Sequence, residues 1–267
     1  MNNLIKANIS AMWRSKAFLG CLIPEIAAAC IFGFASMFVP EWDVADGLIQ
    51  LFLFPMFAAA VFSALFIGTE YSEKTIRNKM IIGKTRTQIY LADLISVFIG
   101  SLVITAAHSV CIMIVSIPFG FAPLPENFAL KAVICICELA SLCSVMTLIA
   151  ANISKRAVTS VLALVFTFGT LIAAEIIETK VQQPETRPSH FYNEDGEYEG
   201  IVEIPNDYAP SKTERAVLQT VFNILPFGGL KSASSDEPDA FFTLYSLGVI
   251  SVTTAAGVLL FRKKDIK

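Results

Sequence analysis

Six long apolar runs divide this chain, and polar or charged segments separate them. A helix of about 20 apolar residues spans roughly 30 Å of hydrocarbon. The pattern predicts transmembrane helices near residues 17–39, 48–68, 94–119, 128–153, 158–177 and 241–261. We therefore expect an all-α integral membrane protein with six transmembrane helices, folded as a single transmembrane domain over residues 1–267, with one long outer loop at residues 178–240.

The composition agrees with this pattern. Hydrophobic residues make up 55% of the chain, charged residues only 16%, and the mean hydropathy is +0.63. A soluble protein needs charge over its whole surface, whereas here the charges gather between the apolar runs. The composition therefore excludes a water-soluble domain, and no basic domain is available to bind nucleic acid.

Basic residues predict the orientation, because short loops rich in Lys and Arg stay in the cytoplasm. Fourteen of the 20 basic residues fall on one side of the predicted spans: Lys6, Arg14, Lys16, Lys74, Arg77, Lys79, Lys84, Arg86, Lys155, Arg156, Arg262, Lys263, Lys264 and Lys267. Both termini are thus expected in the cytoplasm. The outer segment is acidic in its first part, which predicts an exposed loop, and its second part, Glu214 to Gly229, predicts an amphipathic helix broken at Pro226.

The first 14 residues have the pattern of an interfacial helix. One side carries Ile5, Ile9, Met12 and Trp13, and the other carries Asn3, Lys6, Ser10 and Arg14. We expect an elbow helix along the cytoplasmic leaflet that turns into the first span. An ordinary basic anchor before a membrane helix is the alternative.

The segment between the second and third spans is too long for a turn and too polar for lipid. Glu70, Lys74 and Arg77 have the spacing of one helical face, which predicts a short amphipathic helix ending near Gly83. A second helix is expected to begin around Thr85 to Tyr90. The tripeptide Gly83-Lys84-Thr85 resembles the end of a nucleotide-binding loop, but Asn78 stands where that motif requires glycine. The chain is therefore expected to bind no ATP.

Three ionisable residues, Glu25, His108 and Glu138, fall inside predicted spans. A charge at the bilayer centre costs on the order of 3 kcal/mol, so these side chains should face protein or water, or be protonated. Either a transport pathway or a hydrogen-bonded packing role fits them. All six cysteines also fall in predicted spans, so packing thiols are expected and no metal site. No catalytic constellation is expected from the two histidines.

In order and layout these features resemble the bacterial type-2 ATP-binding-cassette (ABC) exporter permeases. The resemblance rests on the elbow, on the segment Glu70–Lys79 followed by Lys84-Thr85-Arg86, and on Leu225-Pro226-Phe227-Gly228 before the sixth span. Lys74-Thr75 departs from the Gly-Thr that the family often has.

The resemblance implies a function for the segment Tyr71 to Met80, which is similar to a coupling helix that docks on a separate ATPase subunit. The implied coupling residues are Glu70, Tyr71, Glu73, Lys74, Thr75, Arg77, Lys79 and Arg86. The implied partners are two copies of an ABC ATPase, which would hold ATP and Mg, together with a second permease copy or a related chain, and membrane lipid. The implied location is the bacterial plasma membrane, and the preferred substrate is an antimicrobial peptide or other amphipathic compound.

The residues alone leave two other classes of function open. An ion-coupled secondary carrier would use Glu25 and Glu138 as proton or cation sites, although no inverted repeat is evident. A non-transporting sensor or assembly subunit would explain the long outer loop. The basic loop after the second span favours the permease, because a carrier needs no docking element for an ATPase.

Overall fold

The structure is a computed structural model of residues 1–267. It describes residues 1–35, 38, 48–49, 51–73, 75–116, 127–153, 155–192, 198–235 and 237–264. Lys74 and Lys267, both among the residues considered above, lie outside these ranges.

Six helices are long and apolar enough to cross a membrane. They are α2 (Lys16–Ala35), α4 (Leu53–Ser72), α6 (Arg86–Ser116), α7 (Phe128–Asn152), α8 (Arg156–Val181) and α11 (Phe241–Lys263). The prediction of an all-α membrane protein with six spans is confirmed. The third helix begins at Arg86, eight residues before the predicted start of its span, because the polar residues that precede the apolar run continue the same helix.

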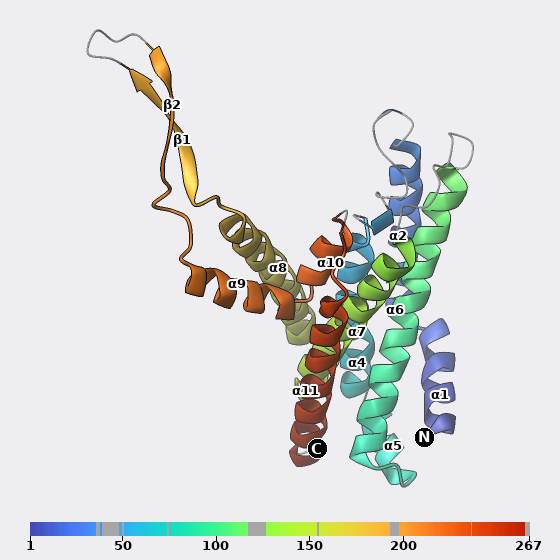
Figure 1. The fold of residues 1–267 in the computed structure, drawn as a ribbon. Helices are drawn as coiled ribbons and strands as arrows, with labels where there is room; N and C mark the ends of the chain where they lie inside the picture. The colour runs from blue at the N-terminus through green and yellow to red at the C-terminus, as the bar shows by residue number, and fades with distance from the viewer. Residues whose placement is uncertain are drawn as a thin grey trace.

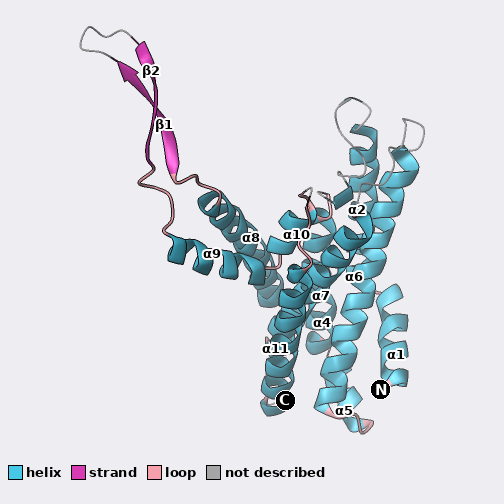
Figure 2. Cartoon of the chain, in the orientation of Figure 1, coloured by secondary structure: helices cyan, strands magenta, loops and turns pink. Residues whose placement is uncertain are grey.

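The two ends of the chain lie at the same end of the helix bundle, as an even number of crossings requires (Figure 1). The short helix α5 (Thr75–Ile81) lies there as well. We call this the termini end. The opposite, or hairpin, end carries the antiparallel strands β1 (Thr186–Tyr192) and β2 (Tyr198–Pro205), which project away from the bundle (Figure 2).

The segment of residues 178–240 differs in part from the exposed outer loop that the sequence predicted. Its acidic part contains the hairpin, in which Thr186 pairs with Pro205 and His190 with Ile201. Its second part forms α9 (Lys212–Ile224) and α10 (Gly228–Ala233), with Pro226 between them. The break falls where the sequence predicted it, since proline has no N–H to continue a helix.

The elbow helix α1 (Asn2–Trp13) packs on protein along one stripe. Leu4, Asn8 and Met12 are buried, at the four-residue spacing of one helix face. The helix contacts α6 and runs beside its lower part in Figure 1. Trp13, predicted on the apolar side, is 51% exposed and contacts the Phe18 ring at the start of α2.

The expected helix carrying Glu70, Lys74 and Arg77 on one face is wrong. Glu70 and Tyr71 belong to the last turn of α4, and α5 starts anew at Thr75. The hydroxyls explain the break: Ser72 Oγ donates to the Thr69 carbonyl, and Thr75 Oγ1 donates to the Glu70 carbonyl at 3.0 Å. These bonds satisfy carbonyls at the end of α4 and let the chain turn. As expected, α5 ends before Gly83, whose φ of 84° favours glycine.

Candidate functional site

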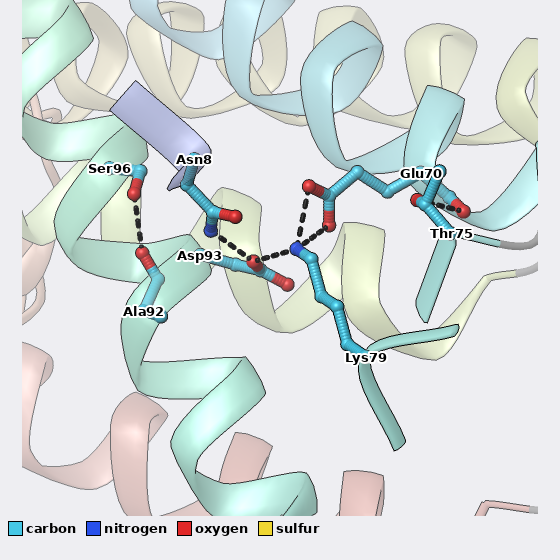
Figure 3. A network of polar contacts seen from close by, with 7 residues as sticks. All are labelled: Asn8, Glu70, Thr75, Lys79, Ala92, Asp93 and Ser96. Carbon is cyan, nitrogen blue, oxygen red and sulfur yellow. Dashed lines mark hydrogen bonds and ion pairs between the residues drawn. The ribbon is translucent and has the colours of Figure 1, made fainter. Parts of the chain in front are cut away.

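Four polar side chains meet where α5 joins the bundle. Lys79 Nζ on α5 lies 2.7 Å from both carboxylate oxygens of Glu70 on α4, and 3.2 Å from Oδ1 of Asp93 on α6. Asn8 on α1 donates its amide hydrogen to the same Asp93 oxygen at 2.8 Å. Figure 3 shows the four side chains pointing toward one another. We call them the Lys79 network; it joins four helices.

The Lys79 network is largely removed from solvent. The side chains of Lys79 and Glu70 are 14% and 12% exposed, and that of Asp93 is 5% exposed. Burial by itself would lower the pKa of Lys79, but the carboxylates of Asp93 and Glu70 outweigh it and raise the pKa above its ordinary value. Lys79 is therefore held as a cation, and it compensates two acidic groups that would be costly to bury without a partner.

A second cluster surrounds Tyr71, on the last turn of α4. Its hydroxyl donates to the Ala151 carbonyl at the end of α7, at 2.6 Å. Lys264 Nζ, just after α11, lies 4.0 Å from the centre of the Tyr71 ring and donates to the same carbonyl. Burial lowers the pKa of Lys264. Tyr71 thus ties the ends of α4, α7 and α11 together.

Arg86, the first residue of α6, binds the end of α11. Its Nη1 donates to the Arg262 carbonyl at 2.7 Å, to the Phe261 carbonyl at 3.4 Å, and also to the Lys264 carbonyl. The last carbonyls of a helix have no partner within that helix, and a cation placed there is favourable. Arg86 therefore acts as a cap on the last span from another part of the chain.

The remaining coupling candidates differ in how far their side chains are exposed to solvent. Glu73 and Arg77 are exposed, and so are Ile81 and Ile82 at the end of α5, which are 72% and 76% exposed. Thr75 faces back toward α4 through its hydrogen bond with the Glu70 carbonyl. The segment thus has an outward surface of mixed charge and apolar character, and an inward side fastened to the bundle.

The intramembrane candidates do not join this site. Glu25 Oε2 on α2 lies 2.9 Å from Nδ1 of the buried His108 on α6. Glu138 on α7 accepts a hydrogen bond from Ser246 on α11 at 2.8 Å and packs against Gly229 of α10. Each pair bridges helices, which fits the packing role. Glu175, in the last turns of α8, pairs with Lys231 at 2.7 Å and stays largely exposed.

Sequence reasoning missed Asp93 and Asn8. Asp93 directly precedes the predicted third span at residue 94, so it was not counted among the intramembrane groups. Both residues lie on buried helix stripes: Asn8 between Leu4 and Met12, and Asp93 between Ile89 and Val97. A polar residue on an apolar stripe was the signal that could have identified them.

Comparison with known proteins gives the family. No curated protein matches the chain. A family model described as "ABC-2 family transporter protein" matches residues 12–173, which run from the end of the elbow helix into α8 and include the Lys79 network except Asn8. The match covers more than half of the 267 residues. This multi-pass membrane protein therefore belongs to the ABC-2 transporter family and is an ABC transporter permease.

Proposed function

We propose that this chain is the membrane-spanning subunit of an ABC exporter, and that it couples ATP hydrolysis by a separate ATPase to substrate export. Family membership supports an ABC ATPase as a partner. The observation that carries the coupling role is the two-sided loop at the termini end. Its outer surface is free to meet a partner, and its inner side is fixed to the transmembrane helices.

The mechanism is mechanical. Glu73, Arg77, Ile81 and Ile82 form the surface on which the ATPase docks, and the Lys79 network and Arg86 transmit its movement. A push on α5 reaches α4, α6 and the elbow through Lys79, because a buried ion pair resists separation. It reaches α11 through Arg86. Closure of the ATPase thereby moves most of the bundle as one unit.

We also propose an orientation of the protein in the membrane. The termini end faces the cytoplasm, because soluble ATPase subunits and ATP are there and because the basic residues gather at that end. The hairpin end faces outward. The membrane is the bacterial plasma membrane, and lipid surrounds the exposed apolar faces of α8 and α11.

Six spans form half of a transporter in this proposal. A second permease copy or a related chain supplies the other half, and two ATPase copies hold ATP and Mg. The chain itself binds no nucleotide and has no catalytic role. The substrate is an antimicrobial peptide or other amphipathic compound, on family analogy alone.

Affinity purification in mild detergent from the native membrane, with mass spectrometry, tests the partner. A roughly stoichiometric ABC ATPase is the expected result. Recovery of the chain alone would contradict the proposed coupling to a separate ATPase.

Charge reversal tests the docking surface. Glu73→Lys with Arg77→Glu should uncouple ATP hydrolysis from transport while the protein still inserts, because both side chains are exposed. Normal transport by this double variant would remove the docking role. Deletion of the gene tests the substrate: lost resistance to amphipathic compounds supports the proposal, and altered ion balance with unchanged resistance contradicts it.

A further inference from the structure

A cavity of about 700 Å³ opens at the termini end, between the elbow, the end of α4 and the start of α8. Besides Lys79, three cations line it: Arg14 and Lys16 at the turn from the elbow into α2, and Arg156 at the start of α8. All three are exposed, and none forms an ion pair with another described residue. Of the two lining carboxylates, Glu70 is already paired with Lys79, so positive charge is in excess.

The cavity is also partly apolar. Its walls include Ala11, Ala17 and Phe66. Exposed apolar side chains lie on the same helix faces as two of these cations: Leu19 and Ile23 are three and seven positions after Lys16 on α2, and Leu164 is eight positions after Arg156 on α8. A ligand with an anionic head and apolar chains would use both features, whereas a small soluble anion would leave the apolar path unused.

The position of Arg156 is fixed by packing. Its Cα and Cγ lie so close to Gly68 on α4 that a Cβ added at Gly68 would be 3.2–3.3 Å from them. Helix α8 begins at Arg156 with no side-chain cap on its first N–H groups, which adds to the attraction for an anion. The half-exposed Trp13 lies on the same elbow, and tryptophan favours the headgroup level of a membrane.

We propose that this cavity binds the phosphate headgroup of an anionic phospholipid from the adjoining leaflet, with the acyl chains along α2 and α8. Basic pockets between transmembrane helices recognise such headgroups. The cavity is also lined by Asn8 and Lys79. The bound lipid therefore lies against the Lys79 network.

Native mass spectrometry of the purified full chain tests this site. Phosphatidylglycerol and phosphatidylcholine with the same acyl chains are added in detergent, and the retained lipid is measured. Phosphatidylglycerol should be retained preferentially. The variant Arg14→Gln/Lys16→Gln/Arg156→Gln should lose this preference, by roughly five-fold in affinity for each cation removed.

A matched control removes three cations from the same end that do not line the cavity: Lys84→Gln/Arg262→Gln/Lys263→Gln. It should bind phosphatidylglycerol within about two-fold of the unmodified chain, because none of its three side chains lines the cavity and solvent screens exposed charges. Equal losses in the two triple variants would overturn the site, as would unchanged binding in the first.

Two further arms complete the test. Ala11→Phe fills the cavity without removing a charge and should also weaken retention; unchanged retention contradicts the proposal even if the triple variant fails to fold. Glycerophosphoglycerol, the soluble headgroup, should compete poorly with the lipid. If it binds as tightly as phosphatidylglycerol, the ligand is a soluble anion and the lipid assignment is wrong.

Discussion

Lys79 Nζ lies 3.2 Å from Oδ1 of Asp93, although the two residues are 14 positions apart and belong to different helices. Asn8 binds the same oxygen from the elbow. One carboxylate therefore fixes both the elbow helix and the loop helix α5 to α6. Because Lys79 lies on α5, replacing it tests how the loop is attached to the bundle.

Removal of Lys79 should destabilise the protein strongly. Lys79→Met leaves the carboxylates of Glu70 and Asp93 close together without a cation, which costs on the order of 3 kcal/mol for a buried pair that loses one partner. Unfolding titrations in a denaturing detergent measure the change. Lys84→Met is the control, because it removes a cation of the same loop that forms no ion pair with a described residue. Equal effects of the two substitutions would show that the Lys79 network contributes nothing specific.

Tyr71 should contribute through its hydroxyl and its ring separately. Tyr71→Phe removes the bond to the Ala151 carbonyl and keeps the ring beneath Lys264, at a cost of about 1 kcal/mol. Tyr71→Leu also removes the cation–π contact, which adds roughly 0.5–1 kcal/mol. The same unfolding titrations separate the two contributions. If Tyr71→Phe lowers the unfolding free energy as much as Tyr71→Leu does, the ring contact with Lys264 contributes nothing to stability.

A side chain at Gly229 should destabilise the protein. A Cβ at this position would overlap Oε1 of Glu138, so Gly229→Ala should cost about 1–3 kcal/mol in unfolding free energy. Gly248→Ala is the control, since an added Cβ there meets no atom within 4 Å. Combining Gly229→Ala with Glu138→Ala should relieve the overlap, and strict additivity in that double variant would contradict the explanation.

The N-terminus of α9 should weaken in acid. Ser211 Oγ accepts from the Glu214 N–H, and a hydrogen bond from Lys180 lowers the pKa of the Glu214 carboxyl. A lowered folded-state pKa means that this stabilisation is present above the ordinary carboxyl pKa, about 4.3, and is lost as pH falls through the lowered value. Hydrogen-exchange protection of the first turn of α9 should fall over that window. Glu214→Gln should show no such change; if it loses protection equally, another group is responsible.

The exposed tip of the loop should matter for binding and not for folding. Ile81→Ser/Ile82→Ser removes apolar area from the proposed docking surface, so less ATPase should be retained on purification while the unfolding titration stays unchanged. Ile201→Ser/Val202→Ser makes the same type of change at exposed positions of the hairpin and should retain the ATPase fully. Loss of the ATPase in both variants would point to a general defect.

The spans could be predicted because hydrocarbon thickness imposes a length on each apolar run. The helix break at Pro226 could also be predicted, because proline interrupts a helix whatever the rest of the fold does. The partner of Glu70 could not be predicted in this way: helical spacing favoured Lys74 and Arg77, but α4 ends at Ser72 and the chain turns so that Lys79 reaches the carboxylate. The contact with Asp93 depends on how α5 packs against α6, which no local spacing encodes. The hairpin was missed because its strands lie among acidic residues that favoured a loop.

The bonds from Arg86 to the end of α11 also bear on biosynthesis. A ribosome makes Arg86 long before Phe261, which is 175 positions further along, so the guanidinium spends most of translation without these acceptors. The loop next to it is fastened to the last span only when that span has been threaded into the bilayer. Assembly of the proposed docking surface is therefore a late event in the maturation of this chain.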